Sequence, residues 1–161
     1  MLIFMVRHGI AEDTHRGGRD EDRELTEEGR LRLADVFRRM GKANIRPAVI
    51  LTSPLVRARQ TAEIAVQALK CGVAPETTPR LTPEATPEDV WDEIRDHREV
   101  QSLMLVGHEP LFSRTVAYLL NSPTLQVDVK KGSVTAIEVQ SFRGGLPQGV
   151  LKWMLTPKLC G

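Results

Sequence analysis

LIFMVRHG, at residues 2–9, is the stretch of this sequence that decides the fold. Its first five residues are apolar, which is typical of a strand buried on both faces in a parallel sheet. A cation, an imidazole and a glycine follow the strand, namely Arg7, His8 and Gly9. Open α/β sheets bind their ligands at the carboxyl ends of strands. Arg7 and His8 are therefore expected at a ligand site, although an Arg-His-Gly tripeptide alone has little specificity.

Beyond this strand, apolar strands alternate with amphipathic helices. Further strands are expected at residues 48–52, 73–77, 102–106, 133–139 and 150–155. Helices are expected from Thr26 as N-cap to a stop at Gly41, after Ser53-Pro54, after Thr86 and at residues 111–120. The alternation predicts an α/β fold, a three-layer sandwich with a mostly parallel central sheet and helices on both faces. The last two strands can pair antiparallel through the connection at 142–149.

Length and composition limit the class of protein. The 161 residues favour a single domain spanning 1–161, and such a chain can bury a core without disulfides or a structural metal. Hydrophobic residues make up 41% and charged residues 27%, which indicates an ordinary globular protein. The formal net charge is +1, so neither a nucleic-acid partner nor a membrane partner is expected. Any site for an anion must come from local placement of cations.

The two cysteines, Cys71 and Cys160, do not have the spacing of metal ligands. They are interpreted as free thiols in a reducing compartment. The apolar run before Arg7 is five residues long, too short for the core of a signal peptide. No apolar stretch approaches the roughly 20 residues of a membrane span. These features predict a cytoplasmic protein.

Three of the predicted strands end in polar residues of similar character. The first strand is followed by Arg7 and His8, the second by Ser53 with Arg57 in the next helix, and the fourth by His108. Parallel strands bring their carboxyl ends to one edge of the sheet, so these side chains are expected to converge. Two arginines, two imidazoles and a helix N-terminus suit an anion with many acceptor oxygens, which a phosphoryl group is.

Phosphoryl transfer mainly requires positioning and charge stabilisation. One histidine can act as an in-line nucleophile if it is neutral, and the other can be cationic and bind oxygens, provided that the pocket separates the two pKa values. A zinc site formed by His8, His108 and Glu109 is the competing interpretation, but the neighbouring arginines oppose a cation. The sequence contains no glycine-rich nucleotide-binding loop. Neither a metal nor a cofactor is therefore expected.

Four segments together resemble the histidine phosphatase superfamily, also called the phosphoglycerate-mutase-like family. They are RHG at 7–9, LTEEG at 25–29, SPLVRARQTA at 53–62 and GHEP at 107–110. Their order and spacing agree with the family over nearly the whole chain. The resemblance implies a phosphoglycerate-mutase-like fold and a phosphatase in which His8 becomes phosphorylated. It also implies that Arg7, Arg57 and His108 bind the phosphoryl oxygens.

Within this superfamily the chain is most similar to SixA-type phosphohistidine phosphatases, in its short length, its Leu25-Thr26 segment and its tail at 153–157. Enzymes of that type act on phosphohistidine in histidine phosphotransfer domains, so the resemblance implies phosphotransfer signalling and a phosphorylated protein as partner. Two alternatives stay open. One is a small-molecule phosphomonoesterase that acts on a phosphorylated metabolite, and the other is a non-catalytic phosphate-binding module.

Many members of the superfamily supply a carboxylic acid that protonates the leaving oxygen. In this chain the corresponding segment is 80–89, and Glu84 is the best-placed candidate general acid, with a solvated loop glutamate as the alternative. SixA-type proteins are similar in lacking a clear acid there. Imidazole leaves more readily than an alkoxide because its conjugate acid has a pKa of about 6.5. Arg23, in the loop at 10–24, is a candidate substrate-binding residue, and Lys130 and Lys131 are candidates for the rim.

Overall fold

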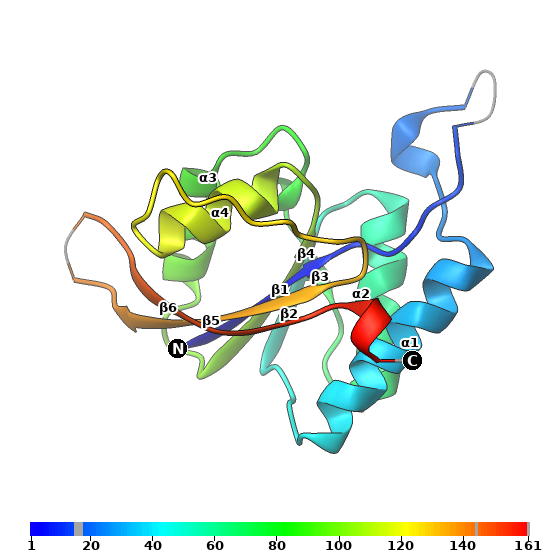
Figure 1. Cartoon of the computed structure of the whole chain (residues 1–161), viewed down its shortest axis with the longest axis horizontal. Coiled ribbons are helices and arrows are strands. Elements are labelled where there is room, and N and C mark those ends of the chain that lie inside the picture. The colour runs from blue at the N-terminus through cyan, green and yellow to red at the C-terminus, as the bar shows by residue number, and fades with distance from the viewer. Residues whose placement is uncertain (15–17, 144, 161) are drawn as a thin grey trace.

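A computed structural model describes residues 1–14, 18–143 and 145–160 of the chain. Its centre is a six-stranded sheet with the strand order β3-β2-β4-β1-β5-β6 (Figure 1). The strands are β1 (Leu2–Arg7), β2 (Val49–Thr52), β3 (Glu76–Thr77), β4 (Ser102–Gly107), β5 (Val134–Ser141) and β6 (Gln148–Leu155). The first four strands run parallel, whereas β5 is antiparallel to β1 and β6 is antiparallel to β5. The predicted mostly parallel sheet is confirmed, and its last two strands do pair antiparallel.

Helices cover both faces of this sheet (Figure 1). They are α1 (Glu27–Lys42), α2 (Val56–Leu69), α3 (Pro87–Asp96) and α4 (Leu111–Leu119), with short 3₁₀ helices η1 (Asp20–Asp22), η2 (Pro79–Leu81) and η3 (Pro157–Leu159). Alternate residues of β1 enter different cores. Phe4 and Val6 pack under α1 and α2, whereas Ile3 and Met5 pack under α3 and α4. The five apolar residues of the opening stretch are thus explained by burial on both sides, and the predicted sandwich is confirmed.

Two helix starts follow from the local sequence as predicted. Thr26 caps α1, and its side chain accepts a hydrogen bond from the Gly29 amide at 2.9 Å. Thr86 caps α3 and forms a capping box with Asp89. A cap of this kind contributes about 1 kcal/mol. The Thr26 amide also donates to the carbonyl of Ile10 at 2.9 Å, so α1 begins against the segment that follows β1.

Three predicted boundaries are wrong. Helix α2 begins at Val56, not directly after Ser53-Pro54, because the hydroxyl of Ser53 lies 2.8 Å from His108 Nε2 instead of capping a helix. Helix α1 continues through Gly41 to Lys42, and the left-handed residue beyond it is Asn44, with φ +57°. Of the strand expected at 73–77, only the last two residues pair with β2.

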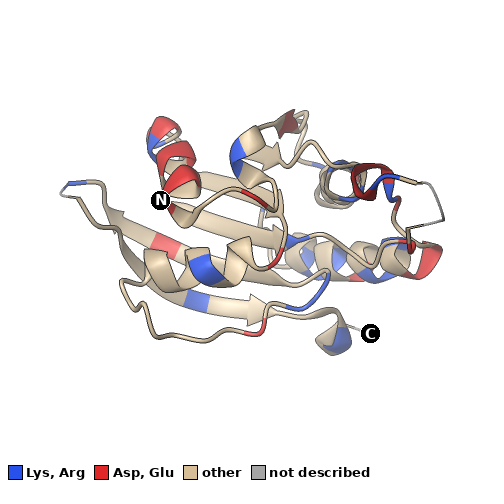
Figure 2. Cartoon of the chain, turned by 90° about the horizontal axis from the view of Figure 1, so that it is seen from above, with Lys and Arg blue, Asp and Glu red and all other residues tan. Residues whose placement is uncertain are grey.

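Charged residues lie mainly on the helices and loops, and the strands are nearly free of them (Figure 2). One exception is the exposed β5–β6 edge, where Lys152 and Glu138 form an ion pair at 3.0 Å. In the described part of the chain, no helix combines the length and the apolar character needed to cross a membrane. Cys71 and Cys160 are free thiols.

Candidate active site

The carboxyl ends of β1, β2 and β4 meet at one edge of the sheet. In the sheet register, Arg7 pairs with Gly107 and Thr52 pairs with Val106, so the residues that follow each strand are neighbours. The backbone continues this pairing, because the His8 amide donates to the carbonyl of Gly107 at 3.0 Å. As a result, the rings of His8 and His108 lie with their centroids 5.0 Å apart. The structure therefore brings together side chains that are about one hundred residues apart in sequence.

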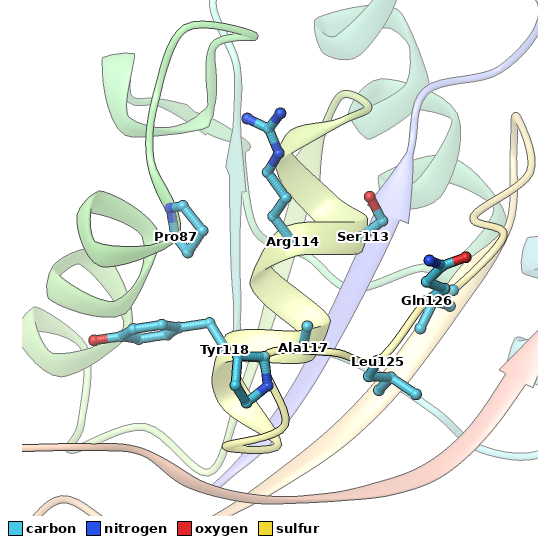
Figure 3. Close-up of a pocket in the computed structure, with 9 residues that line it drawn as sticks. Pro87, Ser113, Arg114, Ala117, Tyr118, Leu125 and Gln126 are labelled. Carbon is cyan, nitrogen blue, oxygen red and sulfur yellow. The ribbon is translucent and has the colours of Figure 1, made fainter.

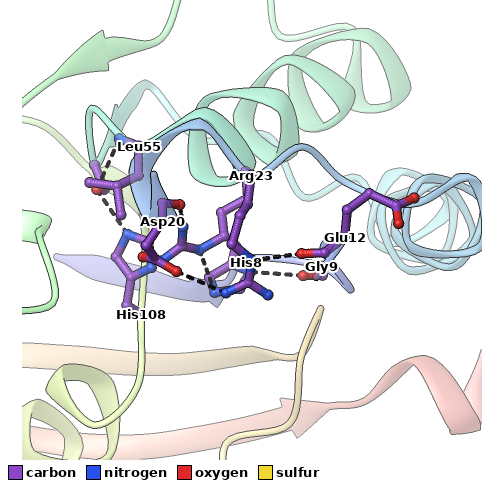
Figure 4. Close-up of polar contacts among 9 residues, drawn as sticks. His8, Gly9, Glu12, Asp20, Arg23, Leu55 and His108 are labelled. Carbon is purple, nitrogen blue, oxygen red and sulfur yellow. Dashed lines mark hydrogen bonds and ion pairs between the residues drawn. The ribbon is translucent and has the colours of Figure 1, made fainter. Parts of the chain in front are cut away.

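The ring of His8 is held so that one nitrogen faces the pocket. Its Nδ1 lies 2.7 Å from the carbonyl oxygen of Gly9. A carbonyl only accepts hydrogen bonds, so this contact assigns the proton to Nδ1 and leaves the lone pair on Nε2. Arg57 Nε donates to Nε2 at 3.3 Å (Figure 4). The ring nitrogen that carries the lone pair thus lies directly beside a guanidinium.

Gly9, next to His8, contacts helices α1 and α2. Its amide donates to Thr61 Oγ1 at 3.2 Å, and the same hydroxyl donates to the carbonyl of Arg57 at 2.7 Å. A Cβ atom on Gly9 would lie 2.7 Å from a methyl carbon of Leu33 in α1. A side chain at position 9 would therefore press on the buried Leu33 of α1, and Thr61 links the backbone next to His8 with that of Arg57.

His108 is buried, and its Nε2 lies 2.8 Å from the hydroxyl of Ser53. Sequence reasoning missed this role of Ser53, because a serine before a proline is also a common helix start. The next residue, Glu109, accepts a hydrogen bond from the Ser113 amide at 2.7 Å. Its carboxylate thus caps the first turn of α4, beside the pocket.

Arg7 reaches the pocket from the end of β1. Its Nη1 donates to the carbonyl of Val129 at 2.7 Å, which fixes one end of the guanidinium. Its Nε is buried and has no hydrogen-bond partner among the described residues. Since an unpaired buried donor is costly, this group is well suited to bind an anion oxygen.

Burial lowers the pKa of both imidazoles. For His8 the pKa falls to about 4, through burial first and then through the charges of Arg57, Arg7 and Lys131. For His108 it falls to about 3, through burial first and then through His8 and Arg57. Both rings are therefore neutral near pH 7. A neutral His8 is the state that a nucleophile needs. A phosphoryl group would bring negative charge and raise the pKa of His108.

The loop between β1 and α1 adds residues to the site (Figure 4). Arg23, a sequence candidate, donates through Nε to the carbonyl of Glu12 at 2.6 Å and through Nη1 to Asp20 Oδ1 at 2.9 Å. Asp20, which the sequence had not indicated, also accepts from Arg57 Nη2 at 2.9 Å. Its position depends on how the loop folds back over α2, and no local pattern encodes that.

These residues line a pocket of about 250 Å³, formed by Arg7, His8, Asp20, Arg23, Arg57, Pro83, His108, Glu109 and Lys131. The four catalytic candidates, Arg7, His8, Arg57 and His108, contribute to its wall, and so does the substrate-binding candidate Arg23. Glu84 does not: it is exposed, and its neighbour Pro83 lines the pocket instead. Lys131 lines the rim, whereas Lys130 pairs with Asp128 outside it.

A second hollow of about 370 Å³ lies along α4 (Figure 3). Its wall is mostly apolar and includes Ala117, Tyr118 and Leu125. Arg114 is its single cation among the lining residues, and neither pocket histidine reaches it. Although larger, this hollow is less suited to a phosphoryl group than the pocket at the strand ends.

Comparisons with known sequences identify a family model and a relative. A sequence model of the histidine phosphatase superfamily (branch 1) matches residues 3–83, about half of the chain. That segment contains Arg7, His8, Arg23 and Arg57. An uncharacterized protein of Picosynechococcus sp. is 38% identical over 112 residues, which cover 68% of this chain and 67% of that protein.

Solved structures agree with the fold. The protein histidine phosphatase SixA, solved with tungstate, has a TM-score of 0.86 and 23% identity, over 99% of both chains. SixA from Agrobacterium tumefaciens has a TM-score of 0.83 and 24% identity, over 97% of both chains. A mycobacterial glucosyl-3-phosphoglycerate phosphatase, solved with VO3, has a TM-score of 0.72 and 20% identity, over 94% of this chain and 97% of that one. At these identities the likeness concerns the fold.

Proposed function

The chain belongs to the histidine phosphatase superfamily, and from this premise we propose that it is a metal-independent phosphatase that acts through a phosphohistidine on His8. The observation that carries the proposal is the orientation of His8. Its Nδ1 is held by the Gly9 carbonyl at 2.7 Å, and its Nε2 faces the buried guanidinium of Arg57. These contacts leave Nε2 as the ring nitrogen without a proton and place it beside a cation, which is where an in-line nucleophile for a phosphoryl group is needed.

In the first step, the lone pair of His8 Nε2 forms a bond to phosphorus, and the bond between phosphorus and the leaving group breaks. Arg7, Arg57 and His108 bind the phosphoryl oxygens, and their fixed donors stabilise the charge of the transition state. In the second step, water bonds to phosphorus and the P–N bond to His8 breaks. The phosphate leaves with both protons of the water, and His8 returns to its neutral form.

The proposed substrate is protein phosphohistidine, as in a histidine phosphotransfer domain of a signalling pathway. When the second ring nitrogen of a phosphohistidine carries a proton, the imidazole leaves as a neutral molecule and needs no further acid. An exposed Glu84 outside the pocket wall is compatible with such a substrate. The fold likeness to SixA, over 99% of both chains, supports the same choice.

A small phosphorylated metabolite is the second candidate substrate. The likeness to a glucosyl-3-phosphoglycerate phosphatase, at a TM-score of 0.72, shows that this fold also serves such a phosphatase. For that reaction the alkoxide must be protonated as it leaves. Glu84 is the proposed acid, and it would have to turn from its exposed position towards the pocket.

We also propose a cytoplasmic location, because the two cysteines are free thiols.

A substrate panel tests this function. Turnover of a phosphorylated histidine phosphotransfer domain, an aryl phosphate and alkyl phosphates is measured with the wild type and with His8→Ala, each with and without EDTA. We expect the phosphorylated domain to be the best substrate, activity to persist in EDTA, and His8→Ala to be inactive. Full activity of His8→Ala, or a requirement for a divalent metal, would rule out the mechanism. Faster turnover of a sugar phosphate would favour the second candidate.

A further inference from the structure

Asp20 binds two of the cations that surround the pocket. Its Oδ2 accepts from Arg57 Nη2 at 2.9 Å, and its backbone oxygen accepts from Arg57 Nη1 at 2.8 Å. Its Oδ1 accepts from Arg23 Nη1 at 2.9 Å (Figure 4). The side chain of Asp20 is 58% exposed, whereas that of Arg57 is 6% exposed. A residue at the mouth of the pocket thus holds a guanidinium that lies inside it.

The contacts with Asp20 restrict how the Arg57 guanidinium can turn. Because Nη1 and Nη2 both donate to the same residue, the two bonds fix the plane of the group, as a bidentate pair does. The remaining nitrogen, Nε, then faces His8 Nε2 at 3.3 Å. With one end of the guanidinium held by Asp20, its Nε edge points at the nitrogen to which phosphorus would bond.

The backbone of Arg57 is held separately. Its carbonyl accepts from Thr61 Oγ1 at 2.7 Å, inside α2. The flexible part of Arg57 is therefore its side chain, and Asp20 is the partner that fixes the end of that side chain. Arg23 is fixed in a similar way, between Asp20 and the Glu12 carbonyl at 2.6 Å.

Asp20 does not use up the donors of Arg57. A guanidinium has five N–H groups, and Asp20 takes one from each of two nitrogens. The Nε–H and the second hydrogen of each terminal nitrogen are left for His8 and a phosphoryl group. The carboxylate also stays ionised, since the hydrogen bond from Arg23 is the first cause that lowers the pKa of Asp20.

We propose that Asp20 is a positioning residue, which holds Arg57 and Arg23 in the orientation in which they bind the phosphoryl group transferred to His8. The inference rests on the proposed function, because it concerns the same site. Asp20 touches the two arginines rather than the reacting atoms, so its effect is expected mainly in kcat and in the affinity for an oxyanion.

The test compares Asp20→Ala, Asp20→Asn and Asp22→Ala. Asp22 is a matched control, because it lies in the same 3₁₀ helix but binds the exposed Arg19, at 2.9 Å. We expect Asp20→Ala to lower kcat about 10- to 100-fold, the size of loss that a misplaced group causes. Asp20→Asn keeps one acceptor oxygen and should be intermediate, and Asp22→Ala should resemble the wild type. Circular dichroism and thermal unfolding check that each variant is folded.

Calorimetric titration with tungstate gives a second measurement that does not need turnover. We expect Asp20→Ala to bind tungstate more weakly than the wild type, and Asp22→Ala to bind it equally well. Tighter binding or faster turnover in Asp20→Ala would show that the carboxylate competes with the phosphoryl group, which would overturn the proposal. Unchanged kcat and unchanged affinity would overturn it as well. A wild type that binds tungstate but hydrolyses no substrate would instead overturn the proposed function.

Discussion

For single residues, the chemistry of the site depends on which nitrogen of each ring is held and which is free. The Gly9 carbonyl accepts a hydrogen bond from Nδ1 of His8, and the Ser53 hydroxyl is hydrogen-bonded to Nε2 of His108. The two histidines could be predicted from sequence, because each directly follows a buried strand. The roles of Ser53 and Asp20 could not, because their partners lie far away in sequence and are chosen by the folded loops.

Titration of the two histidines follows from their burial. We expect His8 and His108 to titrate far below the ordinary histidine range, with pKa values of about 4 and about 3. Ring-proton NMR between pH 8 and the acid limit of the folded state would show this, and His108→Asn would assign the signals. Added tungstate should raise the pKa of His108, because a nearby anion favours the imidazolium. A midpoint near 6.5 for either ring would contradict the described pocket.

The same low pKa values bear on stability. In the unfolded chain these rings bind protons at about pH 6.5, whereas in the folded chain they do so only near pH 4 and below. Protonation therefore favours the unfolded state. The contribution of the two rings to stability is complete above about pH 6.5 and falls as the pH is lowered towards 4.

For secondary-structure elements, the site depends on how closely β1 approaches α1. Gly29 lies in the first turn of α1, and a Cβ atom there would be 2.3 Å from the carbonyl oxygen of Ile10. The helix therefore packs against the backbone that follows His8 and Gly9. The start of α1 could be predicted, because the Thr26 cap is local. The start of α2 could not, because Ser53 has a distant partner in His108.

Substitution of Gly29, with Gly41 as a control, tests the contact between α1 and the backbone at Ile10. We expect Gly29→Ala to destabilise the fold by about 1–3 kcal/mol, because backbone must move to make room, and to lower activity by displacing Gly9. Gly41→Ala is the matched control in the same helix, since its Cβ would meet nothing closer than 3.7 Å. It should leave stability unchanged or raise it slightly, because alanine has the higher helix propensity. Denaturant unfolding measures both, and equal effects of the two substitutions would refute the packing argument.

For the whole molecule, the fold explains how a nearly neutral protein builds an anion site. Its net charge is +1, yet the end of β1, the first turn of α2 and two loops bring Arg7, Arg57, Arg23 and Lys131 to one pocket. The sandwich and the strand ends could be predicted, since burial patterns are local. The substrate could not be predicted in the same way, because the loops around the pocket, rather than the sheet, select the leaving group. Glu84 is the residue on which that choice can be tested.

The choice of leaving group predicts how Glu84→Gln behaves. If Glu84 protonates a leaving oxygen, the variant should lose at least about tenfold in turnover of an alkyl phosphate, since general acids contribute 10²–10⁴-fold. Turnover of phosphohistidine should change little, because imidazole needs no such acid. Glu88→Gln, at an exposed position in the first turn of α3, is the control. Equal losses on both substrates would contradict the assigned role.

Trapping of the covalent intermediate tests the central claim most directly. The wild type and His8→Asn are mixed with a phosphotransfer domain that carries ³²P on its histidine, quenched in alkali, and digested for peptide mapping. The account predicts label on the peptide that contains His8, which water then removes, and no label on His8→Asn. Label on a different residue, or full turnover by His8→Asn without a labelled enzyme, would contradict it.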